Sequence, residues 1–277
     1  MRIDAHQHFW LYNSAEYGWI DESMAAIRRD FVPEDLAGEL SANEFNGSVA
    51  VQARQTLEET RWLLELAAAS PRILGVIGWV GLRSPAVHSQ LKPFARNPKL
   101  VGVRHIVQAE TDDRFLLRPD FLCGISLLEE FDLAYDILIY TRHLPVAAEF
   151  VEKFPRQRFV LDHMAKPPIK AGEIDVWEKG IRQLAAFPNV FCKVSGLVTE
   201  ADWHHWMPEQ IRPYLDVVFD AFGSERLMIG SDWPVCLVAG QYSRVMNVVN
   251  DYVRSNCPGA LEAILGGNAQ RFWQLKA

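Results

Sequence analysis

The N-terminal stretch Arg2-Ile-Asp-Ala-His-Gln-His-Phe-Trp10 reads as a short strand that carries two histidines and a carboxylate. Side chains at positions i, i+2 and i+4 of a strand point to the same face of a sheet. Asp4, His6 and His8 are therefore predicted to converge, an arrangement that folding alone does not require. The same strand begins a regular alternation of strands and helices, and that alternation decides the fold.

Short apolar strands alternate with longer segments of helical periodicity along the 277 residues. One helix start is marked by the capping box Thr56-Leu-Glu-Glu59. Eight strand–helix units predict a parallel sheet that closes into one TIM-like (β/α)8 barrel over residues 1–277. A doubly wound open sheet is the alternative, but the first strand runs into His-Gln-His rather than a glycine-rich phosphate turn. We expect the strands at residues 2–7, 48–53, 73–79, 100–105, 133–140, 158–163, 189–195 and 226–231.

The composition and net charge of the chain restrict the classes of protein to which it can belong. Lys and Arg number 28 against 35 Asp and Glu, and the net charge of −7 argues against a nucleic-acid binder. No apolar run approaches the roughly 20 residues of a membrane span, and the first strand begins too early to leave room for a signal peptide. The four scattered cysteines lack Cys-x-x-Cys spacing, which favours free thiols in a cytoplasmic protein.

Polar and aromatic residues gather at the carboxyl ends of the predicted strands, where (β/α)8 barrels hold their active sites. Asp232, in Gly230-Ser-Asp-Trp-Pro234, could accept a proton from water or simply cap a turn. Asp136 and Lys193 would be costly to bury alone, so they either line the pocket or pair with each other across the barrel. The strand-end residues are His6, His8, Gln52, Arg54, Trp79, Arg104, His105, Asp136, Tyr140, His163, Lys166, Lys193, Ser195, Asp232 and Trp233.

The histidines and their neighbours allow two readings. His6 and His8 are metal ligands or neutral hydrogen-bonding groups, and Asp4 is expected to orient an imidazole as carboxylates do around metal sites. Alternation along the sixth strand places His163 in the pocket and Asp162 toward the helix layer or a loop amide. An arginine such as Arg104 can hold a carbonyl or carboxylate with several donors.

Several of the nine tryptophans lie beside these strand ends, among them Trp10, Trp19, Trp79 and Trp233. An indole has a flat apolar face and a single donor, which suits a sugar-like or planar ring. Core packing is the alternative for each tryptophan. The sequence contains no Gly-x-Ser-x-Gly elbow, P-loop or dinucleotide fingerprint.

Three phrases carry a resemblance to a known family: Asp4-Ala-His-Gln-His-Phe-Trp10, Leu161-Asp-His-Met-Ala-Lys-Pro167 and Ser231-Asp-Trp-Pro-Val-Cys236. The chain resembles the amidohydrolase superfamily over its full length. Within that superfamily, these phrases resemble the branch of sugar lactonases. The resemblance implies a hydrolase that opens an L-fuconolactone-like 1,5- or 1,4-lactone to the aldonic acid, with Asp232 as general base. It implies a catalytic group of Asp232, His163, His6 and His8, and substrate contacts from Arg104, His105, Gln52, Trp79, Asp136, Lys193 and Trp233.

The fourth predicted strand ends in Arg104-His105, where two-metal members of this superfamily carry a lysine that bridges their ions. The resemblance therefore implies either one divalent ion, zinc or manganese, on His6, His8 and Asp232, or no metal at all.

Other functions stay open at this point. The alternatives are a metal-dependent decarboxylase of the same superfamily, a pyrone-dicarboxylate-type lactonase and, in another class, a non-catalytic ligand-binding barrel. We expect a small-molecule sugar lactone as partner, with no nucleic acid and no membrane, and leave assembly into a homo-oligomer open. The roles of His143, His204 and His205 are also undecided.

Overall fold

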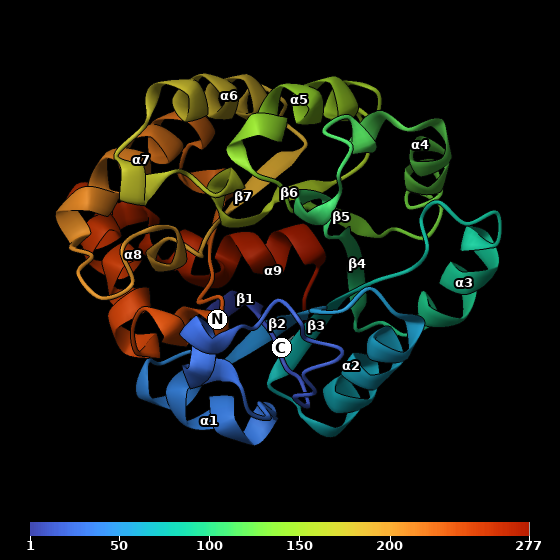
Figure 1. Cartoon of the computed structure of the whole chain (residues 1–277), viewed down its shortest axis with the longest axis horizontal. Helices are drawn as coiled ribbons and strands as arrows, with labels where there is room; N and C mark the ends of the chain where they lie inside the picture. The colour runs from blue at the N-terminus through green and yellow to red at the C-terminus, as the bar shows by residue number, and fades with distance from the viewer. Residues whose placement is uncertain (277) are drawn as a thin grey trace.

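Eight parallel strands form one sheet in the computed structural model, which describes residues 1–276. Each strand pairs with the next in sequence, and helices surround the sheet (Figure 1), so the predicted (β/α)8 barrel is confirmed. The strands are β1 (Ile3–Gln7), β2 (Gly47–Val51), β3 (Ile73–Gly78), β4 (Leu100–His105), β5 (Ala134–Ile137), β6 (Phe159–Leu161), β7 (Val190–Val194) and β8 (Leu227–Ile229). The helices are α1 (Pro33–Ala42), α2 (Leu57–Ala69), α3 (Val87–Phe94), α4 (Pro119–Ser126), α5 (Leu144–Glu152), α6 (Asp175–Ala185), α7 (Pro208–Phe222), α8 (Tyr242–Asn256) and α9 (Asn268–Trp273).

The capping box at the start of α2 is confirmed only in part. The Thr56 side chain accepts a hydrogen bond from the Glu59 amide, as predicted. The Glu59 carboxylate instead accepts from the Ala53 amide at 2.6 Å and from Arg54 at 3.0 Å. Glu59 therefore fixes the loop that leaves β2, and this loop borders the carboxyl end of the barrel.

The barrel closes between the end of β1, with the residue that follows it, and the segment that follows β8. The Asp232 amide donates to the His6 carbonyl at 2.9 Å, and the His8 amide donates to the Trp233 carbonyl at 2.6 Å. The closing contacts thus involve the same residues that the sequence singles out as chemical groups.

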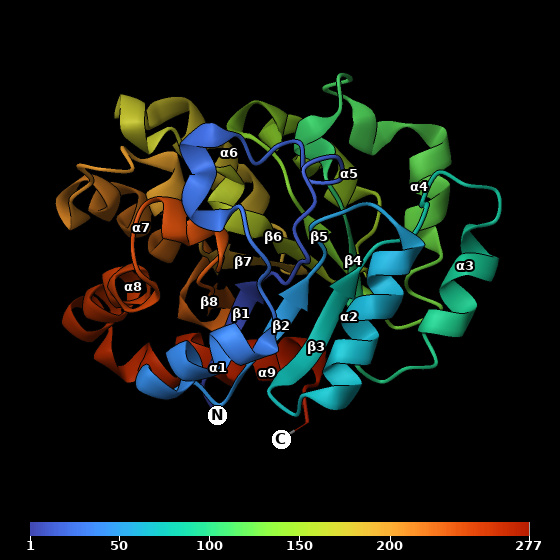
Figure 2. The same cartoon turned by 60° about the horizontal axis from the view of Figure 1, so that its bottom comes forward.

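Helix α9 covers the amino-terminal end of the barrel. Phe272, Trp273 and Leu275 pack into one apolar cluster with inward side chains of the strands, such as Ile3 and Val49. Figure 2 shows α9 beneath the strands, whereas the segment between β1 and α1 crosses the opposite end. The amino-terminal end of the barrel is therefore plugged, whereas the carboxyl ends of the strands border an open cavity.

Strand β1 departs from the predicted alternation. Its pairing register shifts between Asp4 and Gln7, as expected for a β-bulge. Ile3 and Ala5 belong to the barrel interior, while Asp4 bonds to Tyr242 of α8 on the outer side. The prediction that Asp4 shares a face with His6 is therefore wrong, because the bulge turns His6 inward after Ala5.

Two further features bear on the class of protein. None of the described helices is both long and apolar enough to cross a membrane. Cys123, Cys192, Cys236 and Cys257 are free thiols, as predicted.

Truncation of the buried plug tests the role of α9. Trp273→Ala should lower the free energy of unfolding by about 3–5 kcal/mol, because the indole fills the barrel end and the cavity left behind cannot collapse. Denaturant unfolding measures the loss. The control is Val176→Ala, whose side chain is 77% exposed and should change stability by no more than about 0.5 kcal/mol. Equal effects of the two variants would contradict the plug.

Candidate active site

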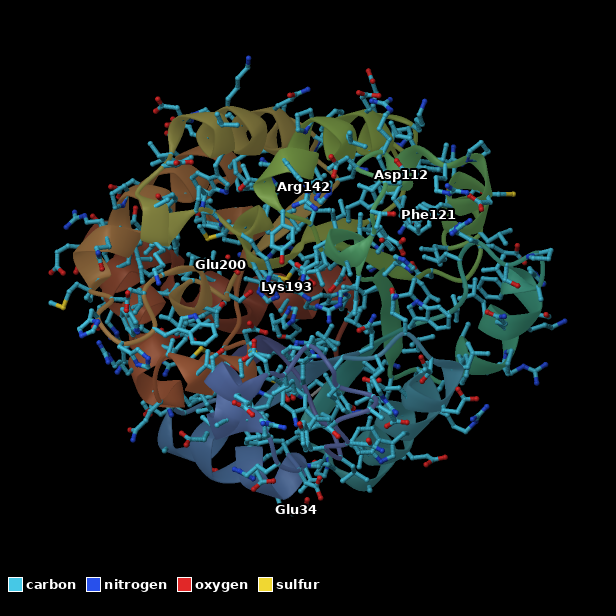
Figure 3. The ribbon with its side chains drawn as sticks, in the orientation of Figure 1. Glu34, Asp112, Phe121, Arg142, Lys193 and Glu200 are labelled. Carbon is cyan, nitrogen blue, oxygen red and sulfur yellow. The ribbon has the colours of Figure 1, made fainter. Side chains whose placement is uncertain are left out.

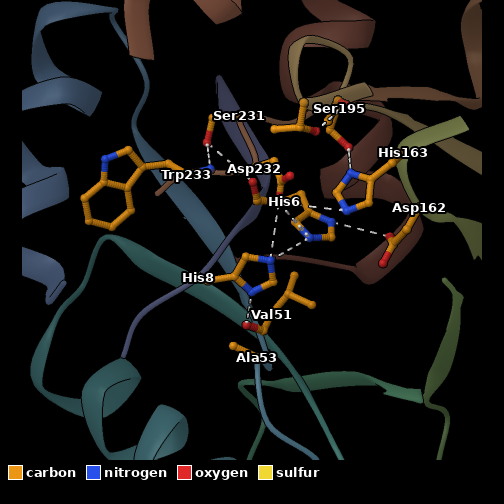
Figure 4. Close-up of polar contacts among 12 residues, drawn as sticks. His6, His8, Val51, Ala53, Asp162, His163, Ser195, Ser231, Asp232 and Trp233 are labelled. Carbon is orange, nitrogen blue, oxygen red and sulfur yellow. Dashed lines mark hydrogen bonds and ion pairs between the residues drawn. The ribbon is translucent and has the colours of Figure 1, made fainter. Parts of the chain in front are cut away.

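Three imidazoles surround one carboxylate oxygen at the carboxyl end of the barrel (Figure 4). Asp232 Oδ1 lies 3.4 Å from His8 Nε2, 3.8 Å from His6 Nε2 and 3.9 Å from His163 Nε2. His6 Nε2 and His8 Nε2 are 3.2 Å apart. All four side chains are buried, so the structure brings together the whole catalytic group that the sequence predicts.

The second ring nitrogen of each imidazole is held in place. His8 Nδ1 lies 2.7 Å from the Val51 carbonyl oxygen, and His163 Nδ1 lies 2.9 Å from Ser195 Oγ. His6 Nδ1 lies 3.4 Å from Asp162 Oδ1. These contacts leave each Nε2 directed at Asp232, which is how outer partners orient histidines at metal sites.

Asp162 is placed differently from the prediction. Val160 packs in the barrel interior, and Asp162 lies two residues further along, so its side chain points to the same face. Asp162 therefore points inward to His6 rather than toward the helix layer or a loop amide. Asp162, and not Asp4, is the carboxylate that orients an imidazole. Strand alternation counted from Val160, rather than from His163, predicts this inward direction of Asp162.

His163 reaches the site because the chain turns sharply after β6. Residues His163, Met164, Ala165 and Lys166 all have φ between +52° and +57°, a conformation that costs about 1–2 kcal/mol for each residue other than glycine. The shift out of strand geometry ends β6 two residues earlier than predicted and turns His163 back over the barrel. Gly196 permits this, because a Cβ there would lie 2.7 Å from His163 Nδ1.

Asp4 clamps the turn that carries Asp232. Its carboxylate accepts hydrogen bonds from the Ser231 amide at 2.9 Å, from Ser231 Oγ at 2.6 Å and from Tyr242 Oη at 3.1 Å. Burial raises the pKa of Asp4 to about 6, although the Ser231 hydrogen bonds oppose the rise. The clamp fixes Asp232, which has a positive φ of 56°.

Beneath the histidines lies a buried group of four charges that balance. Lys193 contacts Asp136 and lies 3.0 Å from Asp162, while Arg104 Nη1 lies 2.9 Å from Asp162. The pairing of Asp136 with Lys193, one of the two readings left open, is thus observed. Burial raises the pKa of Asp136 to about 7 against the effect of Lys193. Burial also tends to raise the pKa of Asp162. The positive charge of Lys193, followed by His6 and Arg104, outweighs burial and holds the pKa of that carboxyl well below its usual range.

Burial and neighbouring charges shift the pKa values of His6, His163 and Asp232. Burial lowers the pKa of His163 to about 4, despite the nearby Asp232. Burial and then Lys193 hold the pKa of His6 well below its ordinary value. For Asp232, burial favours the neutral acid, but the imidazoles, with His163 the strongest, hold its pKa well below the ordinary range. These directions favour neutral His6 and His163 beside an anionic Asp232, which are the protonation states that metal ligation and general-base catalysis both require.

A cavity of about 500 Å³ opens above this group. Of the predicted site residues, His8, Arg104, His163 and Asp232 line it. Arg104 Nη1 also lies 3.3 Å from His6 Nε2, and its Nη2 donates to the Gln52 carbonyl. Gln52 therefore holds Arg104 in place.

Other predicted substrate contacts lie beside the cavity or below it. His105 pairs with Glu110 at 2.7 Å and stacks on Phe115, and Trp79 Nε1 lies 3.4 Å from His105 Nδ1. Alternation along β4 thus directs Arg104 inward and His105 outward. Asp136 and Lys193 are fully buried in the charge group, and the Trp233 ring packs against Phe9 and Phe31, away from the imidazoles (Figure 4). The structure supports these five residues, together with Gln52, as positioning or packing residues.

The remaining histidines lie away from the four-residue centre. His143 is buried, accepts the Tyr140 amide at 3.1 Å and contacts Asp113. His204 and His205 follow the turn at Asp202 and do not line the cavity.

Part of the cavity wall was not predicted from the sequence. Glu200 and Trp203 belong to the loop after β7 and carry no motif that would mark them. Lys166, Tyr140 and Trp19 also line the cavity, although the sequence places them only near strand ends. The further lining residues are Met24, Ala53, Ile106, Gln108, Ala109, Leu138, Thr199 and Val235.

The donor set fits one divalent ion. His6, His8 and Asp232 each offer a ligand atom, and His163 Nε2 lies next to them. Zinc bonds of about 2.0–2.1 Å in a tetrahedron require ligand atoms roughly 3.3 Å apart. The spacings among the ligand atoms of His6, His8 and Asp232, 3.2–3.8 Å, match that requirement after a small contraction.

Substitutions at two glycines distinguish the effect of displacing His163 from the effect of backbone strain. Gly196→Ala should weaken zinc binding about 10- to 100-fold, because the new methyl group displaces His163. Chelator competition measures the affinity. Gly172→Ala is the control: its φ of +69° carries the same strain, but no atom lies within 4 Å of the new Cβ. Equal zinc affinity in both variants would contradict the role of His163.

Comparison with known proteins agrees with this geometry. An amidohydrolase family model matches residues 3–275. L-fucono-1,5-lactonases from Burkholderia multivorans and Burkholderia ambifaria are 41% and 40% identical to the chain, over 99% of it and 96% of each relative. A crystal structure of a Burkholderia multivorans amidohydrolase with bound zinc is 41% identical and superposes with a TM-score of 0.96 over 100% of both chains. The chain belongs to the amidohydrolase family.

Proposed function

We propose that this amidohydrolase is a lactonase that opens L-fucono-1,5-lactone, or a closely related L-sugar lactone, to the aldonic acid. The observation that carries the proposal is the buried Asp232 carboxylate, whose Oδ1 faces three imidazoles at the floor of a cavity. The two Burkholderia lactonases, which match nearly the whole chain, support the substrate class.

Asp232 is the general base. It accepts a proton from the water that attacks the lactone carbonyl carbon, and its Oδ1 is the oxygen that faces the imidazoles. When the tetrahedral intermediate collapses, the ester C–O bond breaks and Asp232 returns the proton to the departing ring oxygen. One water is consumed, and one hydroxyl and one carboxylic acid are formed. Proton transfer by a positioned carboxylate typically contributes about 10²–10⁴-fold to a rate.

Arg104 stabilises the negative charge that develops on the carbonyl oxygen. Its guanidinium borders His6 Nε2 and lines the cavity, while Asp162 and Gln52 prevent it from moving. Donors fixed before the reaction need no reorganisation when charge appears, which makes them effective in a buried site.

A divalent ion would be held by His6, His8 and Asp232, with His163 as the fourth donor. Bound there, it would supply Lewis-acid polarisation of the carbonyl. The zinc-bound relative supports zinc as the ion.

The charges of the cavity favour a neutral substrate over a dicarboxylate. Arg104 and Lys166 are the cations that line the cavity, and each has a carboxylate partner, Asp162 and Glu200 respectively. A substrate with carboxylates, as a pyrone-dicarboxylate lactonase or a decarboxylase would require, would have to compete for these cations. A polyhydroxylated neutral ring meets no such cost.

Replacement of the base tests its role. Asp232→Asn should lower kcat on L-fucono-1,5-lactone about 10²–10⁴-fold, because the amide keeps the shape but cannot accept the proton. A pH-indicator assay measures turnover. Asp132→Asn is the matched control, since Asp132 shares a positive φ of 53° on an exposed turn. If Asp232→Asn keeps more than about a tenth of the rate, another group is the base.

Removal of metal tests the ion site. Chelation followed by desalting should abolish most lactone hydrolysis, and one equivalent of zinc or manganese per chain should restore it, because the four donors form a single site. Elemental analysis run beside the assay gives the stoichiometry. Full activity in protein shown to be free of metal would mean that the imidazoles act as hydrogen-bonding groups alone.

A further inference from the structure

An ion pair in the cavity wall is not used by the proposed mechanism. Lys166 Nζ lies 3.2 Å from Glu200 Oε1, and the two side chains are 19% and 22% exposed. Both residues line the cavity that contains Arg104, His163 and Asp232. Figure 3 shows Glu200 toward the middle of the ring of helices, whereas Glu34 lies at its periphery.

The strained turn after β6 brings this pair over the reacting groups. Lys166 follows His163 by three residues, and their side chains lie on the same side of a tight turn of about three residues. His163 therefore reaches the catalytic floor while Lys166 reaches the wall above it. Strain of this kind persists only where the surrounding structure demands it, and it concentrates at functional sites.

Aromatic rings border the pair. Lys166 Nζ lies 5.6 Å from the centre of the Tyr140 ring, and Trp203 donates to the Thr199 carbonyl at 2.9 Å. Tyr140, Trp203 and Trp19 all line the cavity. Flat apolar faces beside a charged hydrogen-bonding pair suit a ring with C–H groups on its faces and hydroxyls on its rim.

We propose that Lys166 and Glu200 determine specificity by binding adjacent ring hydroxyls of the sugar lactone. The inference rests on the proposed lactonase function and deepens it. The Glu200 carboxylate accepts hydrogen bonds from hydroxyl groups, and the Lys166 ammonium donates to a hydroxyl oxygen. Because the pair is neutral as a whole, it selects for hydroxyls rather than for a charged substituent. A lactone without hydroxyls leaves both groups without their ligand partners, and such a mismatch is strongly discriminating.

Two lactones of the same ring size separate specificity from catalysis. We compare kcat/KM for L-fucono-1,5-lactone and for δ-valerolactone, which has the same ester but no hydroxyls. Lys166→Gln and Glu200→Gln should each lower kcat/KM for the sugar lactone about 10- to 100-fold, as expected for loss of a hydrogen bond to a charged group. The value for δ-valerolactone should change less than about threefold, because the catalytic floor is intact.

The control is Lys170→Gln, which removes a lysine paired with Asp202 at 3.5 Å outside the cavity lining. Melting temperatures identify any variant that fails to fold. Because Lys166 and Glu200 lie on different loops, the test can be made with either variant if the other does not fold. Parallel losses on both lactones, or an unchanged ratio, would overturn the inference. A wild-type enzyme that hydrolyses no sugar lactone would instead overturn the proposed function, and the inference with it.

Discussion

The closure of the barrel between β8 and β1 is the constraint on which the site depends. The Asp232 amide bonds to the His6 carbonyl and the His8 amide to the Trp233 carbonyl, so the backbone that closes the sheet also sets the distances among three chemical groups. Asp4 reinforces this seam from the outer side by holding Ser231 and Tyr242. Any change that opens the seam should therefore disturb stability and chemistry together.

A second constraint lies one layer below. Asp136, Asp162, Arg104 and Lys193 would each be costly to bury alone, but together they balance in charge. The group acts on the site from beneath, because Asp162 orients His6 and fixes Arg104 at the cavity floor. The barrel interior thus has an apolar lower half, plugged by α9, and a charged upper half that supports the active groups.

Local rules failed where the chain leaves regular geometry. Alternation predicted one face for Asp4 and His6, and an outward Asp162, but a bulge in β1 and a left-handed turn after β6 reversed these directions. The same turn explains why Lys166 joins the cavity. Glu200 and Trp203 could not be identified from the chain alone, because loops after strands carry no periodic pattern and their contacts come from distant segments.

The barrel, its eight strands and the grouping of His6, His8, His163 and Asp232 could all be predicted from the amino-acid sequence. This is possible because strand–helix alternation is a local pattern and parallel strands must end at one edge. Which strand-end residues reach the cavity depends on contacts between distant segments: Arg104 enters the cavity, while Lys193 is buried in an ion group and Trp233 packs in the core. The physical reason is that side-chain direction at a strand end depends on bulges, turns and charge partners supplied by other strands.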